Sequence, residues 1–303
     1  MRLRAAILGD AVVDVQASGA EPRAGSDVPA AIRLEPGGQG ANLAVRLARR
    51  GVDVRLGCAL ADDATGRVLR ERLTAEGVEL VAAPADRTGA VVVLVAPNGE
   101  RAMLSQRVPL LAAFGADRLA SLAADVDWVA ISGYVLLEPD ARTAVSPLAG
   151  RPGSRAVLGC ALTAAQAAAW RAAAGACGPS LLVLNADEVA ALTAIDRPAD
   201  AAARLADELS ATVVVTEPGG AVAVVRGTRV AASAPRTGDV VDTTGAGDAF
   251  AAALLASLGS DELDAPALER ALAAAVRAGT AATRTVGAQG RIPGERDPDR
   301  LTP

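Results

Sequence analysis

The stretch Asp242-Thr243-Thr244-Gly245-Ala246-Gly247-Asp248, followed at once by an alanine-rich helical run, is the most informative part of this chain. A glycine-rich turn that opens a helix aims unpaired backbone N–H groups at one point, where the helix dipole also favours negative charge. Asp248 places a carboxylate at the mouth of this anion cradle. A plain helix cap would need one acid and one glycine, and the motif exceeds that need. An anion cradle beside a general base is what phosphoryl transfer to a hydroxyl group requires.

The composition of the chain excludes some classes of binding partner. The chain has 303 residues, a net charge of −5, five aromatic residues and no basic run, so a nucleic-acid-binding surface is not expected. The first 14 residues lack a long apolar run and no charge-free stretch could span a bilayer, so we expect neither a signal peptide nor a membrane partner. Three widely spaced cysteines, Cys58, Cys160 and Cys177, are typical of core residues in a reducing, cytoplasmic setting.

The chain contains no histidine, and every one of its 30 basic residues is arginine. Histidine as a general base or metal ligand is therefore excluded, as is a phosphate-binding or Schiff-base lysine. Acid–base chemistry near neutral pH must fall to a carboxylate, a cysteine or the single tyrosine, Tyr134.

Strand-like and helix-like patterns alternate along most of the chain, which predicts a single α/β domain over residues 1–303 with a mainly parallel sheet. Residues 15–34 and 90–107 interrupt this alternation and are too short for helix crossovers, so they form either a small separate sheet or ordinary surface hairpins. We expect strands at 5–8, 11–13, 52–59, 91–96, 128–132, 181–184, 213–216 and 222–225, and helices at 40–50, 66–76, 161–176, 189–193, 199–209, 249–258 and 267–280.

Two candidate acceptor-binding elements lie near the start of the chain. In Gly37-Gly38-Gln39-Gly40-Ala41-Asn42, adjacent glycines let a ligand approach the backbone and Asn42 offers an amide to hydroxyl groups. The alternative is a flexible helix entry with an asparagine cap. Asp10 and Asp14 follow the first strand, where an open α/β sheet places its ligands, although solvated loop carboxylates would give the same pattern.

Two further elements follow later strands. Asn185 and Glu188 stand three apart at a helix start and share one face, so they could hold a hydrated Mg²⁺; a helix cap with an acidic first turn is the alternative. Thr216-Glu217-Pro218-Gly219-Gly220 turns out of a strand with glycines against which a nucleotide could lie. A plain tight turn explains it equally well.

Taken together, these motifs resemble the ribokinase-like, or PfkB, family of carbohydrate and nucleoside kinases over nearly the whole chain. Both family signatures are present in order, at Gly37–Ala44 and at Asp242–Phe250. The resemblance implies a three-layer α/β/α sandwich with a mainly parallel central sheet and a small β-sheet lid formed by 15–34 and 90–107. It also implies a cytoplasmic, ATP-dependent and Mg²⁺-dependent enzyme, and a homodimer formed through the lid.

The resemblance assigns roles residue by residue. Asp248 would take the proton of the acceptor hydroxyl, while the amides of Gly245, Ala246 and Gly247 would stabilise the transferring phosphoryl group. The acceptor would be bound by Asp14, Gly38, Asn42 and Asp248. The nucleotide would be bound by Asn185, Thr216, Gly219 and Gly247. Asn185 and Glu188 would hold Mg²⁺ through water, and Asp242 with the Thr244 carbonyl matches positions that hold a monovalent cation such as K⁺.

Three departures from the family pattern stand out. Ala61-Asp62-Asp63 replaces Gly-Asp-Asp, the turn at 216–221 is one residue short, and Gly159-Cys160 stands where an Asp or Asn is common. None of these departures touches the catalytic centre, but the shortened turn leaves the adenine contacts open.

The first signature is most similar to that of ribokinases, so the resemblance implies ribose as the acceptor. Fructose, 2-keto-3-deoxygluconate and nucleosides including pseudouridine remain alternatives, and Arg33, Arg101 and Arg107 could bind a phosphosugar. A non-catalytic sugar or nucleotide sensor on the same fold is the alternative outside enzymes. A dinucleotide-dependent oxidoreductase is disfavoured, because no GxGxxG motif follows the first strand.

Overall fold

The computed structural model describes residues 2–19, 24–96, 101–235, 240–260 and 263–296. Within these ranges a large sheet of nine strands has the order β13-β12-β11-β10-β9-β8-β1-β4-β5. Neighbours from β5 through β11 pair in parallel, whereas β11, β12 and β13 pair antiparallel. The strands are β1 (Arg4–Leu8), β4 (Asp53–Leu60), β5 (Val78–Pro84), β8 (Trp128–Ile131), β9 (Ser154–Leu158), β10 (Leu181–Asn185), β11 (Thr212–Glu217), β12 (Gly220–Val225) and β13 (Thr228–Ser233).

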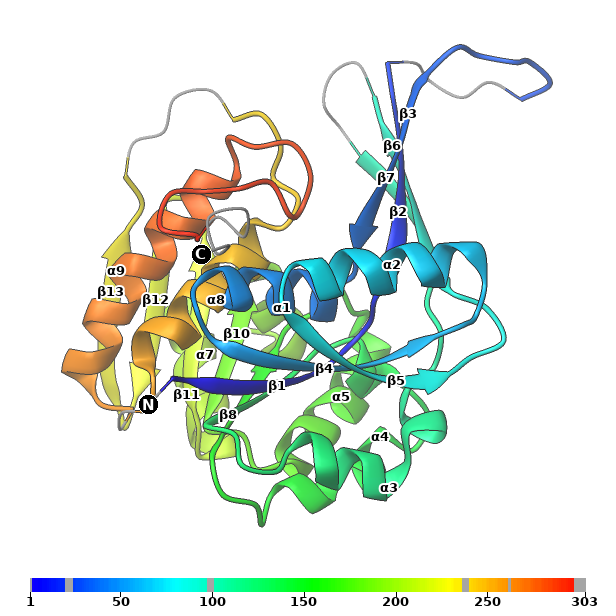
Figure 1. Ribbon diagram of the computed structural model, residues 1–303. Helices are drawn as coiled ribbons and strands as arrows, with labels where there is room; N and C mark the ends of the chain where they lie inside the picture. The colour runs from blue at the N-terminus through cyan, green and yellow to red at the C-terminus, as the bar shows by residue number, and fades with distance from the viewer. Residues whose placement is uncertain (1, 20–23, 97–100, 236–239, 261–262, 297–303) are drawn as a thin grey trace.

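Helices cover both faces of this sheet and create two hydrophobic cores (Figure 1). Successive residues of β1 point to opposite faces, so Ile7 enters one core and Leu8 the other. One core receives α1 (Gln39–Arg49), α2 (Ala64–Ala75), α8 (Ala246–Leu258) and α9 (Ala265–Ala282). The other receives α3 (Leu111–Leu122), α4 (Ala141–Val145), α5 (Ala164–Ala176), α6 (Ala186–Thr193) and α7 (Pro198–Leu209). Burial on both faces explains the nearly continuous apolar strands.

A second, four-stranded sheet projects beyond the main body, at the upper right of Figure 1. Its order is β3-β2-β6-β7, from β2 (Val12–Ser18), β3 (Ala31–Gly37), β6 (Gly89–Val95) and β7 (Arg101–Gln106). The segments 15–34 and 90–107 contribute to this small sheet, apart from residues 20–23 and 97–100, which lie outside the described ranges. The expected strand at 11–13 belongs to β2 of the small sheet. The chain therefore leaves the large sheet directly after β1.

The fold confirms the predicted α/β class with a mainly parallel central sheet and a small additional sheet. Its parallel strands end at one edge, and there the segments after β1, β10 and β11 approach the start of α8. Open parallel sheets bind ligands at this edge because the connecting loops diverge there. Among the described helices, none combines the length and the apolar character needed to cross a bilayer.

Candidate active site

The first turn of α8 is built from the motif 242–248. Gly245 is the N-cap in the left-handed region, with φ of 75°, and a Cβ there would lie 2.6 Å from the backbone of Ala288. Asp242 is buried, and its carboxylate accepts the N–H of Thr244 at 2.7 Å and that of Gly287 at 2.9 Å. These bonds fix the turn. The amide of Ala246 lies 3.3 Å from the Thr243 carbonyl, and a Cβ on Gly247 would meet open space.

Asp248 lies in this first turn, close to two residues that were predicted to bind the acceptor. Its Oδ2 accepts a hydrogen bond from Asn42 Nδ2 at 2.9 Å, across 206 residues of sequence. Enclosure by protein raises the pKa of Asp248 to about 6, while the bond from Asn42 and the charge of Arg46 oppose this rise. The charge of Asp14 adds to it, which shows that the two carboxylates lie near each other. The structure thus brings Asp14, Asn42 and Asp248 together.

Asp14 lies on β2, where burial and the neighbouring Glu35 raise its pKa to about 6 as well. Gly38, which precedes α1, has a φ of 97°, and a Cβ there would lie 2.6 Å from the carbonyl oxygen of Asp10. The glycine therefore allows the start of α1 to pack against the end of β1. This packing directs Asn42, on the first turn of α1, toward Asp248.

Asn185 and Glu188 form a reciprocal cap at the start of α6. Glu188 accepts the N–H of Asn185 at 2.8 Å, and Asn185 Oδ1 accepts the N–H of Glu188 at 2.8 Å. The same two residues line a cavity of about 100 Å³ together with Gly247 and Asp248. Burial raises the pKa of Glu188. Asn185 and Glu188 cap the helix and line the cavity at the same time, so their structural role does not exclude a binding role.

A neighbouring cavity of about 210 Å³ lies on the other side of the α8 turn. Thr216 and Gly247 line both cavities, so the two spaces adjoin at these residues. Gly219, the other residue predicted for the nucleotide, lines this second cavity, and a Cβ there would meet nothing within 4 Å. The space is thus open next to glycine backbone on both sides.

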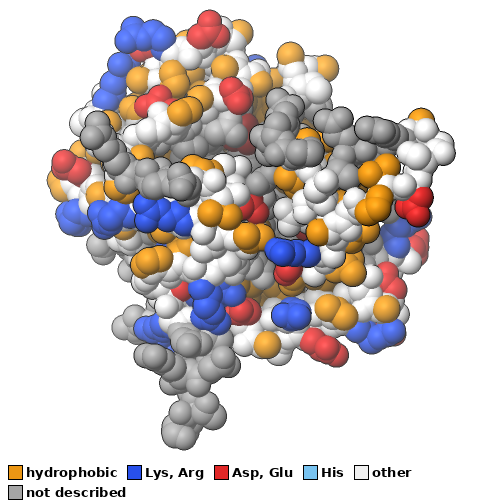
Figure 2. Space-filling view, turned by 90° about the horizontal axis from the view of Figure 1, so that it is seen from above, with side chains coloured by type: hydrophobic (Ala, Val, Ile, Leu, Met, Phe, Trp, Pro, Cys, Tyr) orange, Lys and Arg blue, Asp and Glu red, His pale blue; other side chains and the backbone are white. Residues whose placement is uncertain are grey.

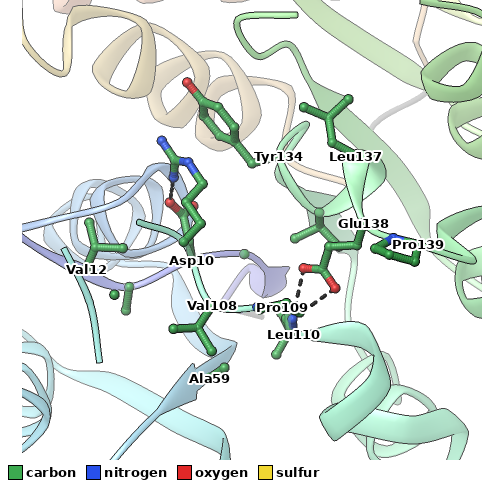
Figure 3. A pocket seen from close by; sticks show the side chains of 15 residues that line it. Asp10, Val12, Ala59, Val108, Pro109, Leu110, Tyr134, Leu137, Glu138 and Pro139 are labelled. Atoms are coloured by element: carbon green, nitrogen blue, oxygen red, sulfur yellow. Dashed lines mark hydrogen bonds and ion pairs between the residues drawn. The ribbon is translucent and has the colours of Figure 1, made fainter. Parts of the chain in front are cut away.

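A third cavity, of about 280 Å³, opens beside Asp10 where the small sheet joins the body (Figure 3). Arg107, directly after β7, forms an ion pair with Asp10 and lies 3.4 Å above the ring of Tyr134. Glu138 accepts the backbone N–H group of Leu110 at 2.9 Å (Figure 3) and that of Leu111 at 2.8 Å. These contacts fix the segment that returns from β7 to α3.

Sequence reasoning missed two glutamines. Gln39 donates to the Gly159 carbonyl at 2.8 Å, accepts from Ser132 Oγ at 2.7 Å and lines the cavity of Asp248. Its position inside the glycine-rich motif was a usable signal. Gln289 donates to Asn42 Oδ1 at 3.0 Å and lies in none of the motifs that the sequence singled out.

The cysteines and the tyrosine are the alternatives to a carboxylate as the general base. All three cysteines are buried and free, and burial raises each thiol pKa to about 12. Burial also raises the pKa of Tyr134. Neither kind of group accepts a proton readily near neutral pH. Among the described residues, no three His, Cys, Asp or Glu side chains are grouped so as to hold a metal ion by themselves.

Two adjoining cavities, a helix N-terminus and a carboxylate together make a site suited to phosphoryl transfer. Residues 3–294 match the profile described as "pfkB family carbohydrate kinase". The chain is 32% identical over 326 residues to a fructokinase from Klebsiella pneumoniae, covering 97% of each chain. It is 31% identical over 287 residues to an aminoimidazole riboside kinase from Salmonella typhimurium, covering 88% of this chain and 86% of the relative.

Solved structures agree on the fold. A ribokinase from Cryptococcus neoformans, solved with ADP, superposes with a TM-score of 0.76 at 22% identity, covering 98% of each chain. The chain therefore belongs to the pfkB family of carbohydrate kinases. It is a phosphotransferase with an alcohol group as acceptor, and more specifically a sugar kinase of this family.

Proposed function

We propose that the protein transfers the γ-phosphoryl group of ATP to a primary hydroxyl of a small neutral sugar, with Asp248 as the general base. The observation that carries this proposal is the position of Asp248 in the first turn of α8, where its carboxylate is hydrogen-bonded to Asn42. A pKa of about 6 keeps most of the carboxylate ionised at pH 7 while leaving it basic enough to accept a hydroxyl proton.

The phosphates would extend from the cavity lined by Thr216 and Gly219 to the one lined by Asp248. Gly247 lines both cavities, and its missing side chain leaves room for a phosphate close to the backbone amides. In this position the amides of Gly245, Ala246 and Gly247 would stabilise charge on the transferring group. The ADP of the ribokinase neighbour supports a nucleotide in this fold.

Two metal sites belong to the proposal. Asn185 and Glu188 supply oxygen atoms at the wall of the smaller cavity, which suits Mg²⁺ held through water. When bound, Mg²⁺ would neutralise charge on the phosphates. Asp242 supplies a buried carboxylate that accepts the N–H groups of Thr244 and Gly287, and the family resemblance pairs this carboxylate with the Thr244 carbonyl as ligands of a cation. This donor set fits a monovalent cation such as K⁺.

The charges around the acceptor side support a neutral substrate. Arg107 is already paired with Asp10, and Asp14 and Asp248 add negative charge. Arg33 is exposed on β3, and the side chain of Arg101 lies outside the described structure. The face in Figure 2 carries acidic as well as arginine side chains among hydrophobic ones. A phosphosugar or sugar acid would therefore meet more repulsion than attraction.

Fructose is the acceptor to test first, because a fructokinase is a relative along nearly the whole chain. Ribose, the acceptor predicted from the first signature, is tested beside it. A coupled ADP-release assay should compare fructose, ribose, 2-keto-3-deoxygluconate, adenosine, pseudouridine and a phosphosugar. We expect turnover with a neutral sugar and little with the phosphosugar. Saturable sugar binding without ADP release for any acceptor would instead favour a sensor.

We further propose that the small sheet is a lid and that two lids pair in a homodimer. In register, Leu34, Val15, Val92 and Leu104 form one row across the sheet, and Ile32, Ala17, Leu94 and Ala102 form the next. Paired residues point to the same face, so this face is apolar from edge to edge. Leu34 and Leu104 are 70% and 67% exposed, and the opposite face carries Asp14. Such an exposed apolar sheet favours a second copy as its cover.

Sedimentation of the purified protein tests the dimer. Leu34→Glu should convert a dimer into monomers, because a charge would be buried at the interface. Met103→Glu is the matched control, since Met103 is 66% exposed on the opposite face of the same sheet. A monomeric native protein, or equal dissociation by both variants, would contradict pairing through this face.

A further inference from the structure

The segment after α9, residues 287–296, is anchored on α1 by buried ionic contacts. Arg46 is fully buried and donates from Nη1 to Glu295 at 2.8 Å and from Nη2 to the Ala288 carbonyl at 2.7 Å. Arg49, one turn further along α1, donates from Nη1 to the Gln289 carbonyl at 2.6 Å. The backbone of Ala288 and Gln289 is therefore held against the helix that carries Asn42.

This anchoring directs one side chain toward the catalytic centre. Gln289 Nε2 lies 3.0 Å from Asn42 Oδ1, and Asn42 Nδ2 lies 2.9 Å from Asp248 Oδ2. We propose that Gln289 is a positioning residue for the catalytic base: its N–H group fixes the Asn42 amide so that the NH₂ end faces Asp248. The proposal rests on the proposed role of Asp248 as the base.

The reason is the two-ended nature of the Asn42 side chain. One end accepts and the other donates, and the two ends can exchange by a half-turn. Turned the other way, Asn42 would present its carbonyl oxygen to the Asp248 carboxylate, which repels it. With its N–H group turned toward Asn42, as in this structure, Gln289 stabilises the productive orientation. Gln289 thereby acts on Asp248 without touching it.

The orientation of the Asn42 amide affects the pKa of Asp248. A hydrogen bond to the ionised carboxylate favours that form and lowers its pKa, against the effect of burial. Three other charged groups face Asp248: Arg46 from α1, Arg107 from the segment after β7, and Asp14 from β2. The two arginines also favour the ionised form and Asp14 opposes it. Since none of these groups changes when Gln289 is replaced, a change in the pKa of Asp248 would report on the Asn42 amide.

The test is Gln289→Met, which keeps length and removes the donor. Gln166→Met, on α5 remote from the site, is the matched control. Carbon-13 NMR of labelled aspartate carboxyls, assigned through Asp248→Asn, measures the pKa of Asp248 directly. We expect a rise of about one pH unit in Gln289→Met, as for the loss of a hydrogen bond to a carboxylate, and none in Gln166→Met.

Kinetics supply a second readout. With the pKa of the base raised by about one unit, the acid limb of the kcat profile moves to higher pH, so kcat falls about three-fold at pH 6.5 and little at pH 8.5. The KM for ATP should stay unchanged. A general loosening of the fold would change this KM as well. In an Asn42→Ala background, Gln289→Met should produce no further shift.

Two results would overturn the proposal: an unchanged pKa of Asp248 in Gln289→Met, or an equal shift with and without Asn42. If the native protein releases no ADP with any acceptor, the proposed function fails. The NMR titration still decides whether Gln289 orients Asn42 toward Asp248.

Discussion

Replacing Asp248 by asparagine should remove activity and at the same time stabilise the fold. The amide keeps the shape of the carboxylate and an oxygen that can accept from Asn42 Nδ2. It cannot take a proton from the acceptor hydroxyl. Loss of a general base lowers kcat by about 10²- to 10⁴-fold, with ATP binding retained.

The gain in stability follows from the pKa of Asp248, which enclosure raises from 3.8 to about 6. A carboxyl group with a raised pKa favours the folded state below its unfolded value and loses this contribution as pH rises through the folded value. Two pH units correspond to an upper limit of about 3 kcal/mol of destabilisation at pH 8. We expect a net gain of about 1 to 2 kcal/mol, because the variant gives up the charge-assisted bond from Asn42.

The pH dependence of this gain separates it from unrelated effects of the substitution. Urea unfolding of both proteins should show a gain roughly 1 kcal/mol larger at pH 8 than at pH 5, because the carboxyl group of the native protein is mostly protonated at pH 5. Asp117→Asn, on an exposed turn of α3, is the control and should change neither quantity. Full turnover by Asp248→Asn would refute the role of the base. A gain independent of pH would refute the enclosure of an ionised carboxylate.

Other perturbations test the surrounding parts. Asp14→Asn should raise the KM for the acceptor about ten-fold or more with little change in the KM for ATP, as steady-state kinetics would show, since a hydrogen bond from a hydroxyl to a charged group is lost. Arg46→Met removes the shorter of the two ion pairs of the buried Glu295, which keeps only Arg49 at 3.6 Å, and should cost about 3 kcal/mol in urea unfolding. Arg2→Met removes only the exposed pair with Asp53 and should cost under about 1 kcal/mol. Chelation of Mg²⁺ by EDTA should stop ADP release, and exchange of K⁺ for a bulky organic cation should slow it; undiminished rates would contradict the two metal proposals.

The regular part of the fold was predictable because its signals are local. The apolar runs at 181–184 and 213–216 became β10 and β11, and the alanine-rich stretch became α5. The strands β9 and β13 were not predicted, because they are short and mix arginine or serine with small residues. The helix α3 was missed as well. It contains Gly115 in a non-helical conformation, which interrupts the apolar period.

The residues of the candidate site also fall into those that local sequence predicts and those that it does not. Residues inside contiguous motifs, such as Asn42, Glu188 and Asp248, could be singled out because turn and helix-start chemistry is written in neighbouring residues. Arg107 and Tyr134 were visible as residue types, but their contact depends on how the segment after β7 packs over the end of β8. The bond from Gln289 to Asn42 joins residues 247 positions apart. No local pattern encodes such a distance.

The charges near Asp248 support our proposal that the α8 turn, rather than a cationic side chain, binds the transferring phosphoryl group. Arg46 is paired with Glu295, and Arg107 is paired with Asp10, so each of these arginines near Asp248 already has a carboxylate partner. They hold segments of the protein together, and displacing either pair would leave a poorly solvated acid. With no lysine in the chain, we expect the backbone amides of Gly245 to Gly247, together with the proposed Mg²⁺, to stabilise the transferring phosphoryl group. On this proposal the stretch 242–248 acts through its backbone amides as much as through the carboxylate of Asp248.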